Sequence, residues 1–300
     1  MKKTLSLVLA LAMCLSLAAC GNNGTQDQSS QSGSNTSASD VSSGSQQGDN
    51  SSVDAADSDW AKIESNGTMK IGITYFEPMN YFDDNGELTG FETEFATAVC
   101  EKLGVTPEFV EINWDSKIME LQAQTIDCIW NGMTITPELQ EALTISDPYI
   151  KNYQVVVIRS DNADVYTSTA DLVGKTVEAE AGSAGEAAII GEGADENLKQ
   201  AEYISAAKQT DTLLEVKTGA ADAAVLDFVL AGAMVGQGDY SDLMIIPDLQ
   251  LSVEEYGIGF RKDSTAAEKV NAAIQALIED GTLNTLAEKY DLAELLLANQ

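Results

Sequence analysis

Apolar runs with strand character alternate with helical patterns from residue 60 to residue 300. Residues 69–74 (MKIGIT) and residues 107–112 predict strands. Residues 91–103 between them repeat apolar side chains at helical spacing, and Gly104 follows as a C-cap. Strands that alternate with helices form a largely parallel sheet. The sequence therefore predicts an α/β fold, and its length is sufficient for two lobes of roughly 100 to 150 residues each.

The second half of the chain repeats this alternation. Its strongest helical pattern, residues 264–280, is amphipathic and is followed by Gly281. Strands are expected at residues 154–158, 175–179, 223–226 and 256–260, and helices at residues 208–218 and 264–280.

Residues 126–148 read IDCIWNGMTITPELQEALTISDP. A short apolar strand at 126–130 is followed by a turn and then by Thr136 and Pro137, the N-cap and first residue of a helix. Asp147-Pro148 closes a second turn. We interpret this segment as the edge of a ligand-binding pocket.

Another helix is expected just before this segment. Asp115 is predicted to cap its N-terminus, and Trp114 is predicted to pack against Met119 as a hydrophobic staple. Lys117 then falls in the first turn of this helix, where the helix dipole disfavours a cation.

Residues 1–20 have the pattern of a bacterial lipoprotein signal peptide. Two lysines precede an apolar run, residues 5–17, that is too short to span a bilayer stably. The following LAACG looks like a lipobox, in which Cys20 is diacylated and becomes the first residue of the mature chain. The alternative is an ordinary signal peptide with a chance cysteine. Residues 21–59 contain no aromatic residue, Leu or Ile, and they predict a disordered tether.

Charge and composition exclude several classes of partner. The chain has 16 basic and 48 acidic residues, a net charge of −32, which argues against nucleic acid and anionic lipid as partners. A membrane link is therefore expected through the lipid anchor only. The absence of histidine from the sequence rules out His-based catalytic triads and imidazole metal sites. Cys100 and Cys128 lie in apolar patterns, which favours buried free thiols over a disulfide, and no metal site is predicted.

Several segments resemble the family 3 solute-binding proteins of polar amino acid ABC transporters. The similar segments are NGELTGFETEFATAVCEKLG (85–104), INWDSKIMELQAQTIDCIWNGMTITPE (112–138), SDPY (146–149), GKTVEAEAGSAGE (174–186), GAADAAVLD (219–227) and EKVNAAIQALIEDGTLNTLAEKY (268–290). The resemblance implies a periplasmic-binding-protein type II fold: two α/β lobes, each a mostly parallel sheet flanked by helices, joined by two crossover strands near residues 151–155 and 252–257. Lobe 1 would comprise residues 60–152 plus 256–300, and lobe 2 residues 153–255.

The resemblance also implies a ligand site between the lobes. The stacking aromatic falls on Phe76, with Tyr75 and Tyr81 as substitutes, and the carboxylate that receives an α-ammonium group falls on Asp227. Each assignment has a structural alternative: Phe76 as core, Thr134 as a turn hydroxyl, and Asp227 as a helix cap. The remaining positions fall on Asn131, Gly132 and Thr134 in lobe 1 and on Glu180, Ser183 and Ala184 in lobe 2.

One departure from the family concerns the ligand's carboxylate. The family commonly carries an arginine clamp where this chain has Leu139. An unpaired, desolvated carboxylate is costly, so we predict that Lys117 receives it, with help from helix N–H groups after Thr136 and at Ser183. A solvated Lys117 is the alternative. Glu180, at a position that is commonly neutral, would make one side of the pocket acidic, although it could also pair with Lys117 or face water.

The implied function is that of an extracytoplasmic substrate-binding lipoprotein, anchored to the outer face of the bacterial cell membrane. It would be a monomer without a cofactor, would bind a small-molecule ligand, an amino acid or a related amine, and would deliver it to an ABC permease and its ATPase. Two alternatives use the same fold. A dehydratase-like enzyme would use Glu180 as general acid or base, and a sensor domain would report ligand binding.

Overall fold

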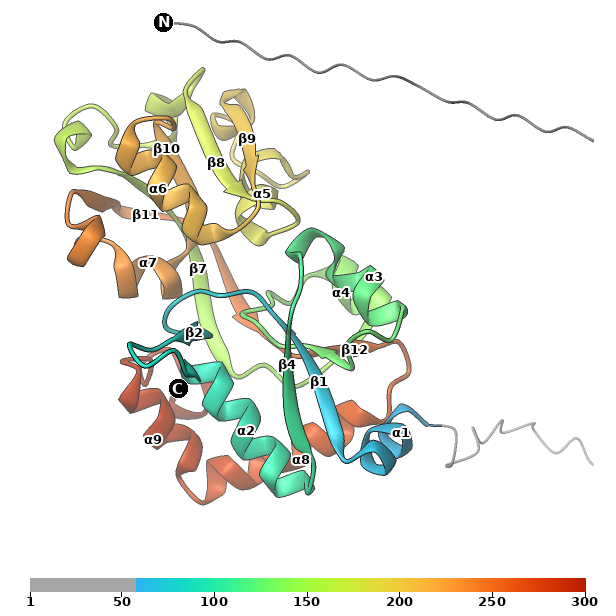
Figure 1. Cartoon of the computed structure of the whole chain (residues 1–300). Coiled ribbons are helices and arrows are strands. Elements are labelled where there is room, and N and C mark those ends of the chain that lie inside the picture. The colour runs from blue at the N-terminus through green and yellow to red at the C-terminus, as the bar shows by residue number, and fades with distance from the viewer. Residues whose placement is uncertain (1–57) are drawn as a thin grey trace, which may run out of the picture. The chain divides into compact units, whose positions relative to one another are not determined.

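A computed structural model describes residues 58–300 of the chain, and it contains two five-stranded sheets, each flanked by helices (Figure 1). The predicted signal peptide, Cys20 and all but the last two residues of the predicted tether lie outside the described residues. Helix α1 begins at Asp59, the last residue of that predicted tether. The two sheets define lobe 1 and lobe 2, and they confirm the predicted α/β fold class.

Lobe 1 is built on the sheet with strand order β4-β1-β5-β12-β6. Strands β4, β1 and β5 are parallel, while β12 runs antiparallel to both of its neighbours. The strands are β1 (Thr68–Ile73), β4 (Thr106–Glu111), β5 (Cys128–Ile129), β6 (Leu143–Ile145) and β12 (Gly259–Arg261), and a small hairpin pairs β2 (Tyr81–Phe82) with β3 (Leu88–Thr89). The helices of lobe 1 are α1 (Asp59–Asn66), α2 (Phe91–Leu103), α3 (Lys117–Gln122), α4 (Pro137–Ala142), α8 (Ala266–Glu279) and α9 (Thr282–Lys289).

Lobe 2 is built on the sheet with strand order β11-β7-β10-β8-β9. Strands β10, β8 and β9 are parallel, and β7 pairs antiparallel with both β10 and β11. The strands are β7 (Ile150–Arg159), β8 (Thr176–Glu180), β9 (Glu202–Ala206), β10 (Ala223–Asp227) and β11 (Leu243–Tyr256), and the helices are α5 (Ala184–Ile190), α6 (Gln209–Thr218) and α7 (Phe228–Met234).

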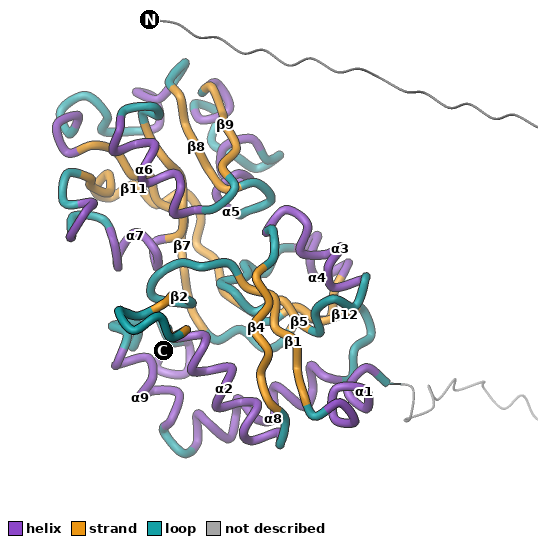
Figure 2. The backbone as a smooth tube through the Cα atoms, viewed as in Figure 1, coloured by secondary structure: helices purple, strands orange, loops and turns teal. Residues whose placement is uncertain are grey.

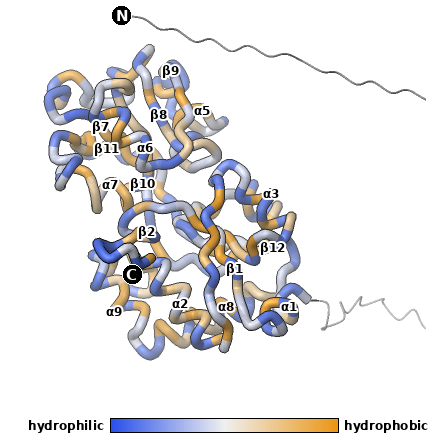
Figure 3. Tube along the Cα trace, viewed as in Figure 1, coloured by the Kyte–Doolittle hydropathy of each residue, from blue (hydrophilic) through white to orange (hydrophobic). Residues whose placement is uncertain are grey.

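The long strands β7 and β11 run from one lobe to the other (Figure 2). They pair with each other along their length, with two irregularities in register between Ile245 and Val253. The apolar residues of both sheets form buried clusters. Figure 3 shows hydrophobic residues along the strands and helices of both lobes. Cys100 and Cys128 are free and buried.

Two local predictions are wrong. The expected strand at residues 256–260 is divided, because β11 ends at Tyr256 in the lobe 2 sheet and β12 begins at Gly259 in the lobe 1 sheet. The expected staple fails because Met119 is 65% exposed. Trp114 instead begins a short 3-10 helix, Trp114–Ser116, whose N-cap is Asn113 and not Asp115.

Candidate functional site

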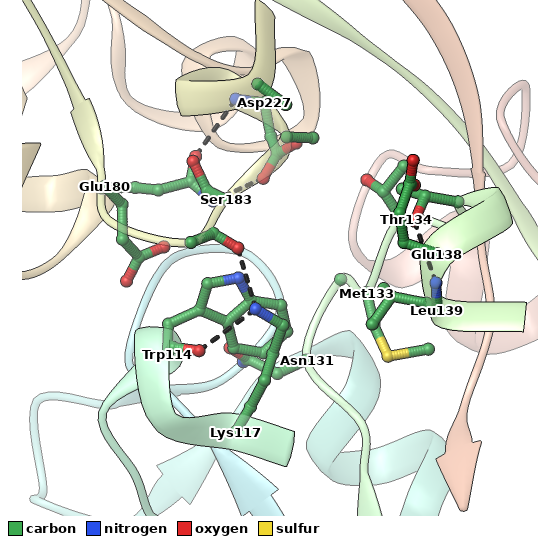
Figure 4. Close-up of a pocket in the computed structure, with 16 residues that line it drawn as sticks. Trp114, Lys117, Asn131, Met133, Thr134, Glu138, Leu139, Glu180, Ser183 and Asp227 are labelled. Atoms are coloured by element: carbon green, nitrogen blue, oxygen red, sulfur yellow. Dashed lines mark hydrogen bonds between the residues drawn. The ribbon is translucent and has the colours of Figure 1, made fainter. Parts of the chain in front are cut away.

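A cavity of about 200 Å³ lies between the two lobes (Figure 4). Its lobe 1 wall comes from the turn after β5 and the starts of α3 and α4, and its lobe 2 wall comes from the ends of β8 and β10. The cavity is lined by Trp114, Lys117, Asn131, Gly132, Met133, Thr134, Thr136, Glu138, Leu139, Glu180, Gly182, Ser183, Ala184, Ala187, Gln209 and Asp227. Eight of the nine predicted ligand-binding residues are therefore brought together, and Phe76 is the exception.

Hydrogen bonds from Asn131 hold the lobe 1 turn in place. The Asn131 side chain accepts from the Thr74 N–H at 2.9 Å and from the Thr74 hydroxyl at 2.6 Å. Its Nδ2 donates to the Thr74 carbonyl at 2.9 Å and to Asn80 Oδ1 at 2.8 Å. Because the amide is already saturated by protein groups, Asn131 shapes the wall and has little capacity left for a ligand.

Gly132 and Phe76 pack against each other beneath this turn. Gly132 has a φ of 56°, a left-handed conformation that favours glycine. A Cβ atom at Gly132 would lie 3.1 Å from Cζ of Phe76. Phe76 is buried in the hydrophobic core and does not line the cavity. The aromatic residue that does line it is Trp114, which was expected to form a hydrophobic staple.

A buried carboxylate supports the turn from below. The Gly132 N–H donates to both Glu92 oxygens, at 2.9 and 3.0 Å, and the Tyr149 hydroxyl also donates to this carboxylate. Burial raises the pKa of Glu92 to about 7. Glu92 was missed in the sequence because nothing in a first-turn glutamate of α2 signals a partner forty residues away.

Lys117 lines the cavity with its ammonium group bound to the backbone. The Nζ atom donates to the Gly182 carbonyl of lobe 2 at 2.8 Å and to the Trp114 carbonyl at 3.2 Å. It also lies 4.8 Å from the centre of the Trp114 ring. Burial lowers the pKa of Lys117. The side chain thus connects the two lobes, and its role as a carboxylate receptor stays a prediction.

Asp227 occupies the N-cap position of α7 but makes no side-chain capping bond. Its Oδ1 accepts from Asn152 Nδ2 at 2.7 Å and from Gln154 Nε2 at 2.6 Å, and its Oδ2 accepts from Gln209 Nε2. Three amides therefore fix a carboxylate at the carboxyl end of β10, facing the cavity. Open α/β sheets place their ligands at this end of the strands.

Glu254 on β11 forms a pair with Asp227. The Glu254 Oε1 accepts from the same two amide nitrogens, Asn152 Nδ2 at 2.6 Å and Gln154 Nε2 at 2.7 Å. Burial and the neighbouring Asp227 raise the pKa of Glu254 to about 7, and burial also raises the pKa of Asp227. Glu254 and Gln209 were missed because only the fold brings them to Asp227.

The lobe 2 wall contains the three remaining predicted residues. Ser183 caps α5 by accepting the Glu186 N–H at 3.1 Å, which places Ala184 at the start of the helix. Glu180 is 2% exposed, and its Oε1 has no hydrogen-bond partner among the described residues. Burial and then Asp227 raise the pKa of Glu180 to about 8. Glu180 lines the cavity on the lobe 2 side, near Ser183 (Figure 4).

Thr134 and Leu139 complete the lobe 1 wall. Thr134 bridges to Tyr256 on β11, and Thr136 caps α4 by accepting the Leu139 N–H at 3.2 Å. Leu139, at the position where the family commonly carries an arginine, also lines the cavity. Outside the cavity, Lys208 of lobe 2 forms a 2.6 Å ion pair with Glu111 of lobe 1.

Within residues 58–300, no group of three or more Cys, Asp or Glu side chains is arranged to hold a metal ion. The same part of the chain has no helix that is long and apolar enough to cross a membrane.

Comparisons with known proteins agree with this architecture. Residues 69–293 match the family of bacterial extracellular solute-binding proteins, family 3. The arginine-binding extracellular protein ArtP of Bacillus subtilis is 28% identical over 221 residues, which cover 73% of this chain and 84% of ArtP. An ABC uptake transporter substrate-binding protein from Streptococcus pneumoniae, solved with bound histidine, is 30% identical with a TM-score of 0.71. The match covers 81% of this chain and 99% of that protein's chain. The ancestral amino acid-binding protein AncCDT-1, a precursor of cyclohexadienyl dehydratase, is 31% identical with a TM-score of 0.68 and covers 77% of this chain and 98% of its own.

Proposed function

The chain belongs to the bacterial extracellular solute-binding proteins of family 3, and from that premise we propose that it captures a polar amino acid or a related small amine-bearing solute for an ABC importer. The observation that carries the proposal is the Asp227 carboxylate, which three amides hold at the cavity wall. Its Oδ1 accepts two of these hydrogen bonds and its Oδ2 one, and Tyr256 and Glu254 also act on the carboxylate. A ligand ammonium group would add a charge-assisted hydrogen bond to it.

The two-lobed fold supports capture by hinge closure. Strands β7 and β11 connect the lobes, while Lys117 and Lys208 make contacts between them across and beside the cavity. Opening and closing about two such strands would admit and enclose a ligand. The residues proposed to contact it are Trp114, Thr134, Glu180, Ser183, Ala184 and Asp227.

The wider context is also part of the proposal. Cys20 would carry the lipid and hold the protein on the outer face of the cell membrane, where it would deliver the solute to a permease and its ATPase. The extracellular relatives support this location. Replacing Cys20 with Ser should release the protein from the membrane fraction, and retention there would contradict lipid anchoring.

A thermal-shift screen of the purified protein against amino acids and amines tests the proposal. A ligand at a hundred times its dissociation constant stabilises the folded state by about 2.7 kcal/mol. The shift should disappear in Asp227→Asn and persist in the control Asp164→Asn, an exposed aspartate of lobe 2. An unchanged shift in Asp227→Asn would contradict the assignment of the site.

An enzymatic function on the same fold is the second candidate. The raised pKa of Glu180, about 8, suits a general acid, and AncCDT-1 precedes a dehydratase. Mass spectrometry of the bound compound after denaturation separates the two candidates. Unchanged ligand supports a carrier, whereas a dehydrated product supports the enzyme.

A further inference from the structure

The cavity has an excess of acidic side chains. Glu138, Glu180 and Asp227 line it, whereas Lys117 is the only basic side chain among the described residues that do. The Lys117 ammonium group already donates to two carbonyls and takes part in none of the ion pairs of residues 58–300. The ionisable side chains that face a ligand are therefore predominantly acidic.

Glu180 is a carboxylate of the cavity wall to which no described residue donates a hydrogen bond at Oε1, and the nearby charge of Lys117 acts on it. Glu180 is 2% exposed, and its Oε1 accepts no hydrogen bond from any described residue. A buried carboxylate oxygen without a donor is costly. Because Glu180 also lines the cavity, an N–H group of a bound ligand would remove that cost.

Glu180 and Asp227 lie close together in the lobe 2 sheet. Each is the last residue of its strand, and β8 and β10 are parallel neighbours. In the register of these strands Ala224 lies opposite Glu178, which places Glu180 one residue from the position opposite Asp227, and the charge of Asp227 contributes to the raised pKa of Glu180. Three amides donate to Asp227, whereas no described residue donates to Oε1 of Glu180.

A ligand carboxylate finds little support in the same cavity. The two helices that begin at its wall, α4 and α5, have only six and seven residues. Their caps, Thr136 and Ser183, already accept the N–H groups of Leu139 and Glu186. A carboxylate would therefore enter beside acidic groups without a free basic side chain to pair with.

We propose that the cavity takes a dibasic amine without a free carboxylate, with one ammonium group on Asp227 and the second cationic group on Glu180. This inference rests on the proposed function, because it names the class of solute that the same cavity would carry. Glu180 is then the residue that selects dibasic over monobasic ligands.

Calorimetric titration with matched pairs tests the inference on the unaltered protein. Cadaverine is lysine without its carboxylate, and agmatine is arginine without its carboxylate. The diamine of each pair should bind at least tenfold more tightly than the amino acid, and pentylamine, which lacks the second cation, should bind at least tenfold more weakly than cadaverine. Tighter binding of lysine and arginine, or equal binding of pentylamine, would overturn the inference.

Two variants locate the second cation. Glu180→Gln should weaken the binding of cadaverine at least tenfold and leave that of pentylamine within about twofold. Glu178→Gln is the matched control, because Glu178 is a buried carboxyl group on the same strand that does not line the cavity. Unchanged cadaverine affinity in Glu180→Gln would refute the role of Glu180.

Failure of the inference is distinguishable from failure of the proposed function. If amino acids bind and Asp227→Asn abolishes that binding, the proposed function holds and only the dibasic inference is wrong. If neither amino acids nor amines bind, both are wrong.

Discussion

The carboxyl group of Glu92 should make the stability of this protein depend on pH. It is fully buried and accepts hydrogen bonds from Gly132 and Tyr149, and burial raises its pKa from 4.5 to about 7. The folded state therefore holds this proton more tightly than the unfolded state. The resulting stabilisation is fully present below pH 4.5 and is lost as the pH rises through about 7.

The size of the effect follows from the difference between the two pKa values. At about 1.4 kcal/mol per pKa unit, this shift corresponds to about 3 kcal/mol of unfolding free energy. Replacing Glu92 with Gln removes the titrating proton and keeps an oxygen that can accept the Gly132 N–H. The variant should therefore gain about 3 kcal/mol relative to the natural protein between about pH 4.5 and about pH 8.

Urea denaturation at a series of pH values, without ligand, measures this difference directly. Comparing the two proteins cancels the contributions of the other buried acids, which both retain. Glu101→Gln, on the exposed side of the same helix, controls for the loss of a carboxylate. A difference between Glu92→Gln and the natural protein that stays constant with pH would refute this account of Glu92.

Three further predictions concern the cavity. Gly132→Ala should lower the free energy of unfolding, measured by urea denaturation, by about 1–2 kcal/mol more than Gly104→Ala does. Both glycines have a positive φ, but only Gly132 packs against Phe76. Equal losses in the two variants would contradict that packing. Lys117→Met removes the hydrogen bond from Lys117 to the Gly182 carbonyl of lobe 2, so it should favour the open form by about 1.5–3 kcal/mol and enlarge the radius of gyration measured by X-ray scattering. An unchanged scattering curve would argue against this link between the lobes. The affinity for amines should rise between about pH 6 and about pH 9. Protons on Glu180 and Glu254, whose pKa values are about 8 and about 7, compete with the ligand cation. An affinity that does not change with pH in calorimetric titration would contradict this.

Local sequence patterns predicted the elements that depend on nearby residues. The helix over Phe91–Leu103 ends at Gly104 as expected, and the cap at Thr136 forms with Pro137 as the first helical residue. These features need only apolar periodicity and the chemistry of capping residues. They also gave the α/β class, because alternation of strand and helix largely determines it.

Features that depend on tertiary packing could not be predicted in this way. The long strand β11 carries polar residues such as Asp248 and Glu254, and only its pairing with β7 makes it a strand. The run at residues 256–260 looks continuous in sequence, yet it passes from one sheet to the other at Gly257. A Cβ atom there would lie 2.8 Å from Ile145, so this position requires glycine because of the packing of lobe 1.

The candidate site shows the same division. Segments similar to a known family indicated eight of the residues that line the cavity, including Asp227 and Thr134. Trp114 was assigned to local helix packing, although it faces the cavity. Glu254 reaches Asp227 only because β7 supplies the two amides that both carboxylates share. No local pattern encodes such a pair.

A crystal structure of the protein with the tightest-binding compound of the amino acid and amine screen tests the central claim most directly. The compound is expected between the lobes, with an amine nitrogen within hydrogen-bonding distance of the Asp227 carboxylate. A compound bound outside this cavity, or bound inside it with its amine turned away from Asp227, would contradict the account.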